Sequence, residues 1–146
     1  MADTVLGIEQ IRIDGRARDK AAAIAEAAQI LEESGAVTAD YLPAMLEREK
    51  VVSTYMGNYL AIPHGTNEAK DAILRSSLSL VRYDEPIDWD GNEVRFVIGI
   101  AGRENEHLSI LSKIAIIFSE DDEVERLLAA GSRRELLDLL VDVNSE

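Results

Sequence analysis

The spacing of hydrophobic positions changes along the chain, and each spacing predicts a different element. Ile11 and Ile13 flank Arg12, and this alternation before Asp14-Gly15 predicts a short strand closed by a turn. Residues 74–83 alternate in the same way and predict another strand. The run 94–101 is the most apolar in the chain, so we expect it to be a central strand of the sheet.

Hydrophobic positions that repeat every three to four residues predict helices. The first helix follows Asp19, a good N-cap residue, and Gly35 is its stop signal. The second should begin near Thr38 and end around Glu49, since Pro43 is tolerated in the first turns of a helix.

Three further helices are expected in the last third of the chain. One has Asn105 as its N-cap, and its buried stripe is expected at Leu108, Leu111, Ile114, Ala115 and Phe118. A short helix covers residues 124–130, and the last one opens with the capping-box pattern of residues 132–135. The succession of strands and helices predicts an α/β domain.

Residues 84–92 are rich in turn-forming side chains, and we expect a loop there. Trp89 lies within this stretch, and we interpret it as a local hydrophobic plug, not as a platform on which a ligand stacks.

Composition limits the possible functions. The chain has 146 residues and is 47% hydrophobic, which fits one domain with its own core, residues 1–146. It has no apolar run of about 18–20 residues and no signal-peptide pattern at Met1–Thr4, so we expect a soluble cytoplasmic protein without membrane insertion. Without cysteine, covalent chemistry has to use other side chains, and the two histidines are the natural candidates.

The formal net charge of −13 argues against nucleic acid as a partner, because binding a polyanion needs clustered Lys and Arg. The charge suits a basic protein partner. The alternative is that the acidic side chains serve solubility on solvated helix faces.

His64 follows a short apolar run that the sequence itself brings to an end. Residues 60–62 can form a buried strand, and Pro63 ends it because proline has no N–H for the ladder. Gly65 lets the backbone turn closely, and Thr66 adds a hydroxyl and an N–H that could face an anion. Alternatively, His64 is a satisfied histidine at a strand end with ordinary turn residues around it.

Several blocks in order resemble the mannitol-type enzyme IIA component of the bacterial phosphoenolpyruvate:sugar phosphotransferase system. They are residues 45–49, 53–57, 61–71, 99–101 and 105–108, and the resemblance spans nearly the whole chain. It implies a mixed sheet of about five strands flanked by helices on both faces. It also implies that His64 accepts a phosphoryl group from the histidine phosphocarrier protein and passes it to a cysteine of a IIB domain.

The same resemblance assigns roles to two further residues. Arg48, at a helix C-terminus, would ordinarily complement the helix dipole, but the resemblance makes it a donor to the phosphoryl oxygens. His107 lies in a first helical turn, where core or capping roles are common, and the resemblance makes it a second, supporting histidine. Asn58 departs from relatives that often have glutamate, so no carboxylate role is expected there.

The mechanism expected from these residues is in-line phosphoryl transfer with a neutral His64, held by Arg48 and the N–H groups of Gly65 and Thr66, without metal or cofactor. One alternative is a regulatory IIA paralogue of the fructose or nitrogen type. The other is a binding module in which His64, His107 and Glu106 hold a metal, although this ligand set is poor. The acidic stretch 120–125 lacks the EF-hand pattern. The sequence names no sugar.

Overall fold

The computed structural model describes residues 5–66, 71–102 and 106–140, except for the side chains of residues 106–108. Its sheet has five strands in the order β1-β4-β5-β3-β2. These strands are β1 (Ile11–Arg12), β2 (Tyr55–Gly57), β3 (Leu60–Ala61), β4 (Ser77–Trp89) and β5 (Asn92–Ala101). β4 and β5 form an antiparallel hairpin, β1 and β3 pair in parallel with its two sides, and β2 pairs antiparallel with β3. The sheet is therefore mixed, with β5 central, as predicted.

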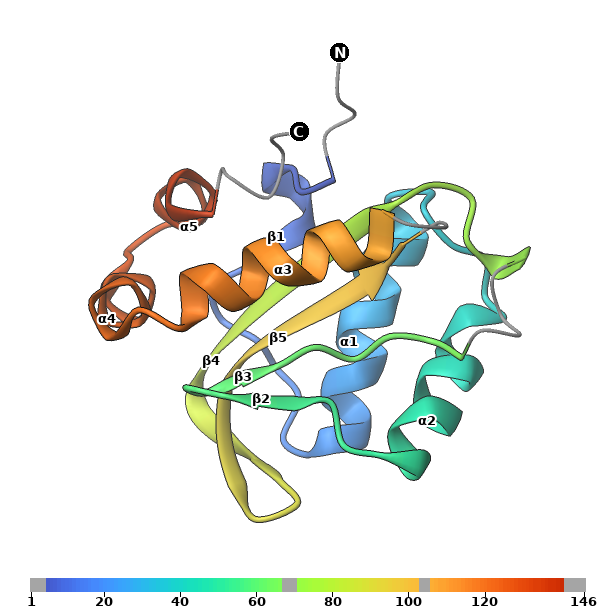
Figure 1. Cartoon of the computed structure of the whole chain (residues 1–146), viewed down its shortest axis with the longest axis horizontal. Coiled ribbons are helices and arrows are strands. Elements are labelled where there is room, and N and C mark those ends of the chain that lie inside the picture. Colours follow the sequence, from blue (N-terminus) through green and yellow to red (C-terminus); the bar gives the residue numbers. More distant parts are fainter. Residues whose placement is uncertain (1–4, 67–70, 103–105, 141–146) are drawn as a thin grey trace.

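Helices cover both faces of this sheet (Figure 1), which confirms the predicted α/β class. α1 (Lys20–Glu33) and α2 (Tyr41–Val51) pack on one face, whereas α3 (Glu106–Phe118) crosses the other. α4 (Asp121–Ala129) and α5 (Arg133–Leu139) continue on the α3 side, and a short 3-10 helix, Ile8–Gln10, precedes β1. No helix in the described part of the chain is long and apolar enough to cross a membrane.

Strand alternation divides the core into two layers. Leu78 and Leu80 of β4 pack with Phe96 of β5 in the layer that contains α3. Val81 and Val97 point the opposite way, into the layer that contains α1 and α2. The alternation predicted for residues 74–83 is thus confirmed from Ser77, where β4 begins, because side chains two apart on a strand share a face, whereas residues 74–76 precede the strand.

The predicted signals for the first helix are present in the structure, whereas α2 is shifted at both of its ends. The Asp19 carboxylate accepts a hydrogen bond of 2.8 Å from the Ala22 N–H, and Gly35 has a left-handed φ of 79°. α2 begins at Tyr41 and not near Thr38, because the Thr38 carbonyl accepts from the Tyr41 N–H in a turn ahead of the helix. The helix also runs two residues beyond the predicted end, to Val51.

The loop predicted over residues 84–92 is wrong. β4 continues through this stretch to Trp89, with Ile87 paired to Val94 and Trp89 to Asn92. The turn is confined to Asp90 and Gly91, which both have positive φ, the conformation of a two-residue hairpin turn. Trp89 is fully buried, as a hydrophobic plug should be.

The helices on the second face follow the prediction in part. The buried positions of α3 are Ile110, Ile114, Ile117 and Phe118, with Leu111 partly buried, so the stripe lies slightly differently around the helix than predicted. The predicted cap Asn105 and the side chain of Leu108 lie outside the described residues. In α5, Ser132 accepts from the Glu135 N–H at 3.2 Å, while the Glu135 carboxylate accepts from the Gly131 N–H and so completes no capping box with Ser132.

Candidate functional site

His64 lies just beyond the carboxyl end of β3, where the chain stops pairing as a regular strand. Pro63 cannot donate to the ladder, but its carbonyl accepts a hydrogen bond of 3.0 Å from the Ile100 N–H. His64 forms an isolated parallel bridge with Ile100 near the end of β5. The imidazole is therefore carried just beyond the end of a strand, as predicted, and lies next to the central strand β5.

The half-buried imidazole of His64 is oriented by its own backbone. Its Nδ1 lies 2.9 Å from the Ile62 carbonyl oxygen, and because a carbonyl only accepts, Nδ1 carries the proton. In the neutral ring the lone pair is then on Nε2. Burial lowers the pKa of His64 below its ordinary 6.5, and the positive charge of Arg48 lowers it as well, against the opposing effects of the Ile62 carbonyl and Glu49. The neutral, nucleophilic form is thus favoured at neutral pH.

Tyr41 is a member of this site that sequence reasoning missed. Its hydroxyl accepts a hydrogen bond of 2.9 Å from the Gly65 N–H and donates one of 2.7 Å to the Ile100 carbonyl. A Cβ atom on Gly65 would lie 2.6 Å from the Tyr41 ring, so glycine is required here for close packing. Burial raises the pKa of Tyr41 to about 12, which keeps the hydroxyl protonated.

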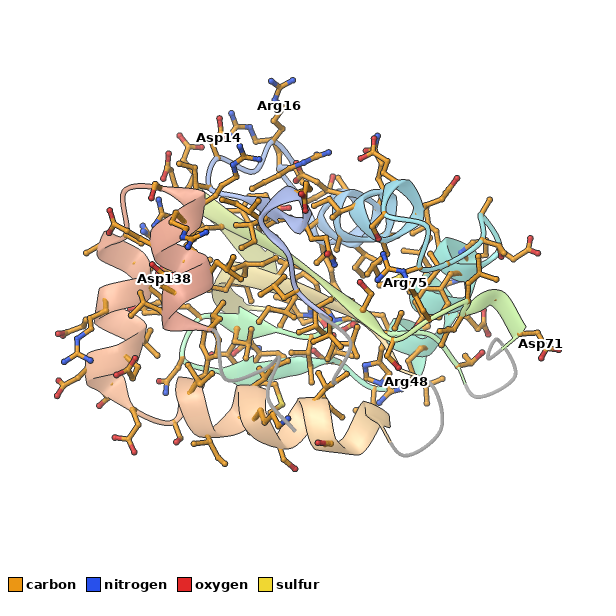
Figure 2. All side chains as sticks on the ribbon, turned by 90° about the horizontal axis from the view of Figure 1, so that it is seen from above. Asp14, Arg16, Arg48, Asp71, Arg75 and Asp138 are labelled. Carbon is orange, nitrogen blue, oxygen red and sulfur yellow. The ribbon has the colours of Figure 1, made fainter. Side chains whose placement is uncertain are left out.

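Arg48 lies in the last turn of α2, near enough for its charge to act on His64. Its Nη1 donates a hydrogen bond of 2.8 Å to the carbonyl of Val52, the C-cap residue that follows the helix. In Figure 2, Arg48 lies between Asp138 on the left and Asp71 at the right-hand end of the view. Half-buried Thr66 follows directly after Gly65 in the chain. The structure thus brings Arg48, His64, Gly65 and Thr66 to one region.

His107 lies in the first turn of α3, as predicted, but its side chain lies outside the described residues. The supporting role expected of His107 therefore stays a prediction. The side chain of Glu106, a ligand in the alternative metal site, also lies outside the described residues. Within the ranges that the structure describes, no three His, Cys, Asp or Glu side chains gather closely enough to hold a metal ion.

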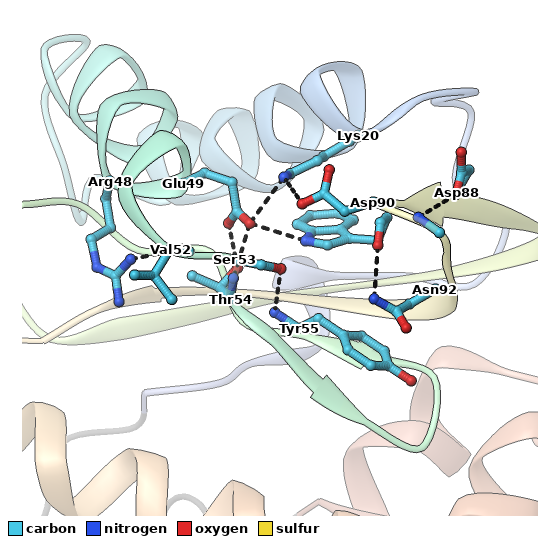
Figure 3. A network of polar contacts seen from close by, with 12 residues as sticks. Lys20, Arg48, Glu49, Val52, Ser53, Thr54, Tyr55, Asp88, Asp90 and Asn92 are labelled. Carbon is cyan, nitrogen blue, oxygen red and sulfur yellow. Dashed lines mark hydrogen bonds and ion pairs between the residues drawn. The ribbon is translucent and has the colours of Figure 1, made fainter.

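Glu49, next to Arg48, is the centre of a buried polar network (Figure 3). Its carboxylate accepts hydrogen bonds from the N–H and hydroxyl of Thr54 and from Trp89 Nε1, and it forms an ion pair of 3.2 Å with Lys20 Nζ. The network ties the end of α2 to the segment that enters β2. Its long-range contacts explain why local sequence patterns gave no sign of it.

Asn58 has a structural role that a carboxylate could not fill. Asn58 and Tyr59 both have positive φ in the turn between β2 and β3. The Asn58 side-chain amide donates a hydrogen bond of 2.6 Å to the Phe118 carbonyl at the end of α3. A glutamate at this position would have no proton to donate in its ionised form.

Comparison with known proteins assigns this geometry to a family. Residues 4–143 match the model of the family described as phosphoenolpyruvate-dependent sugar phosphotransferase system, EIIA 2. The chain belongs to this family. Its members are phosphotransfer components, so this EIIA-2 protein is a component with transferase activity, and the resemblance seen in the sequence is confirmed.

Individual relatives of this EIIA-2 protein cover nearly all of it. The mannitol-specific phosphotransferase enzyme IIA component of Halalkalibacterium halodurans is 54% identical over 144 residues, or 99% of both chains. The crystal structure of IIA mannitol from Escherichia coli matches with a TM-score of 0.86 and 38% identity, covering 92% of this chain and 98% of that one. A complex of Escherichia coli enzyme IIA mannitol with phosphorylated enzyme IIB gives a TM-score of 0.86 at 37% identity, covering 93% and 96%.

Proposed function

We propose that this EIIA-2 protein carries phosphoryl groups for mannitol uptake, with His64 as the phosphorylated residue. The observation that carries the proposal is the His64 imidazole, whose Nδ1 is bound to the Ile62 carbonyl so that its nucleophilic lone pair is on Nε2. The names of the relatives support mannitol as the sugar, at 54% identity for the Halalkalibacterium halodurans protein. The solved complex of a relative with phosphorylated IIB supports a IIB domain as acceptor.

The transfer has two in-line steps. In the first, the Nε2 lone pair of His64 attacks the phosphorus on the histidine phosphocarrier protein, and the donor's P–N bond breaks with its electron pair returning to the donor nitrogen. In the second, a cysteine thiolate of the IIB domain attacks the same phosphorus. The P–N bond to His64 then breaks, and the lone pair returns to Nε2. These partners act in the cytoplasm.

The charge on the transferred group is met by this chain's own donors. Arg48 supplies a guanidinium near His64, and Thr66 follows the turn with a hydroxyl and a backbone N–H. The Gly65 N–H is bonded to Tyr41, so it reaches a phosphoryl oxygen only by sharing that bond. His107 has the supporting role of orienting His64 or donating to the phosphoryl oxygens.

The test is phosphorylation with phosphoenolpyruvate, enzyme I and the histidine phosphocarrier protein, followed by mass spectrometry of acid-labile phosphate. We expect one phosphoryl group on the unmutated chain and none on His64→Ala, with nitrogen-15 NMR locating it on Nε2. His107→Ala is the matched control, which should still be labelled at His64 but pass the group on roughly a hundredfold more slowly. Acid-labile phosphate on His64→Ala would refute the assignment.

Partner docking should depend on charge as well as on apolar contact. Val51 and Val52, just after Arg48, are 72% and 61% exposed and offer apolar surface beside the site. The net charge of −13 should steer a basic partner toward the chain. We therefore expect the association rate with the histidine phosphocarrier protein to fall as salt is added, measured by stopped-flow fluorescence. If the association rate does not change up to a few tenths molar salt, the negative charge serves solubility and does not steer the partner.

A further inference from the structure

Tyr41 bridges a gap in the hydrogen bonding between the chain around His64 and the central strand. In a parallel ladder, a residue's N–H and C=O bond to the two neighbours of its partner. Ile100 makes the first of these bonds directly, since its N–H donates to the Pro63 carbonyl. The second would run from the Gly65 N–H to the Ile100 carbonyl, and the Tyr41 hydroxyl bridges these two groups.

The bridge has a consequence for His64. The residue before it is held to Ile100 directly, and the residue after it is held to Ile100 through Tyr41. The chain can thus turn away from the sheet after His64 while both flanking peptide groups stay fixed to the central strand. The ring itself is then set by its bond to the Ile62 carbonyl.

The aromatic ring makes the bridge specific. Tyr41 is only 2% exposed, and its ring fills the space that a Cβ on Gly65 would need. The ring can therefore pack this closely only against a glycine. Because Tyr41 opens α2 and Arg48 lies near its end, one helix positions both the turn and the guanidinium beside it. Such a buried hydroxyl with two backbone partners is costly to lose, since both groups would be left without that partner.

Building on the proposed function, we propose that Tyr41 is a positioning residue for phosphoryl transfer. Its hydroxyl holds the Gly65 peptide to Ile100 so that Nε2 of His64 keeps the line of attack on the phosphorus. In-line transfer depends steeply on such placement, and a displacement of about 1 Å can cost on the order of a hundredfold in rate. Tyr41 acts through the backbone groups that its hydroxyl binds.

The decisive variant is Tyr41→Phe in the full chain, which removes the hydroxyl and keeps the ring. The matched control is Tyr83→Phe, because Tyr83 is also buried and its hydroxyl donates a hydrogen bond of 2.6 Å to Glu26. Tyr83 lies about 17 Å further along β4 than Leu78, the partner of Ile100, so its loss should not reach His64. Single-turnover transfer from the phosphorylated histidine phosphocarrier protein is measured over a range of donor concentrations.

We expect the maximal transfer rate of Tyr41→Phe to fall roughly tenfold or more with the half-saturating donor concentration unchanged, since the hydroxyl is buried away from the partner. Tyr83→Phe should stay within about twofold of the unmutated rate. A Tyr41→Phe rate equal to the unmutated one, or equal losses in both variants, would overturn the proposal.

Amide hydrogen exchange gives a second readout, which does not depend on phosphoryl transfer. The Gly65 N–H should be protected, and Tyr41→Phe should expose it to exchange. Exchange of the unmutated Gly65 N–H at the rate of an open peptide would refute the bridge. If the unmutated chain accepts no phosphate at His64 while Gly65 is protected, the proposed function fails and the structural bridge stands.

Discussion

Two glutamates are buried in the described part of the chain, Glu26 in α1 and Glu49 in α2, and they are bound in similar ways. Each accepts a hydrogen bond from an aromatic side chain, Tyr83 for the first and Trp89 for the second. Glu26 also accepts two backbone N–H groups from a neighbouring loop and Glu49 accepts one, and each pairs with one cation. In both cases a buried carboxylate fixes a connecting segment that hydrophobic packing alone would leave loose.

The two carboxylates differ in their position relative to the candidate site. Glu26 fixes the segment between β1 and α1, next to a cavity of about 1100 Å³ and away from His64. Glu49 follows Arg48, and its negative charge acts on the His64 imidazole. The same arrangement of donors therefore serves folding alone at the first place, and folding together with the electrostatics of the site at the second.

The largest effect is expected when each carboxylate is replaced by an amide. Glu26→Gln and Glu49→Gln both put an NH₂ group where N–H and O–H donors converge, so we expect each to lose about 2–4 kcal/mol of unfolding free energy in urea titrations. Glu49→Gln should also lower the pKa of His64, followed by NMR, and slow phosphoryl transfer. If Glu26→Gln shifted the pKa of His64 equally, the two networks would not be separate.

A second test separates the two regions by pH. Burial lowers the pKa of His64 below 6.5, so its contribution to stability is complete above that pH and is lost as pH falls through the lowered value. For Glu26, burial would raise the pKa, but hydrogen bonds from Tyr83, Arg16, Ala17 and Arg12 outweigh it and lower the pKa below 4.5. Its contribution is therefore lost at still lower pH. Urea unfolding at a series of pH values should show the first loss disappear in His64→Gln and the second in Glu26→Gln.

The smallest effect is expected from the two cations. Lys20 and Arg12 keep 23% and 36% of their side chains exposed, so Lys20→Met and Arg12→Met should each cost about 1 kcal/mol or less of unfolding free energy. Each cation also has a second acidic partner, Asp90 for Lys20 and Glu33 for Arg12. Lys20→Met should cost more, because Lys20 Nζ also lies 5.5 Å from the Trp89 ring centre. Thermal unfolding in low and high salt measures both, and a larger loss for Arg12→Met would reverse the order.

Part of the fold could be predicted because its signals are local. The cap at Asp19, the stop at Gly35 and the strand end at Pro63 each depend on neighbouring residues, and all three are present in the structure. The hairpin of β4 and β5 was missed although Ile87 and Trp89 alternate with polar residues before Asp90-Gly91. That pattern is a strong hairpin signal, but the density of turn formers around it favoured a loop.

The members of the site could be predicted only where they are neighbours in the sequence. His64, Pro63 and Gly65 are such neighbours. Tyr41 and Glu49 act through partners in distant strands, Ile100 and Trp89, and such contacts exist only once helix α2 has packed against the sheet. No period or motif in one sequence encodes that packing, which is why both residues had to be found in three dimensions.

The strand order also determines when the site can form during synthesis. β1 pairs with β4, Ile11 against Leu80, and β3 pairs with β5, Leu60 against Phe96. A nascent chain that ends at Thr66 therefore contains His64, α1 and α2 but neither long strand on which they pack. Because chains emerge from the N-terminus first, the proposed phosphoryl acceptor His64 is synthesised before the strands that position it, and its site can form only after the hairpin of β4 and β5 has left the ribosome.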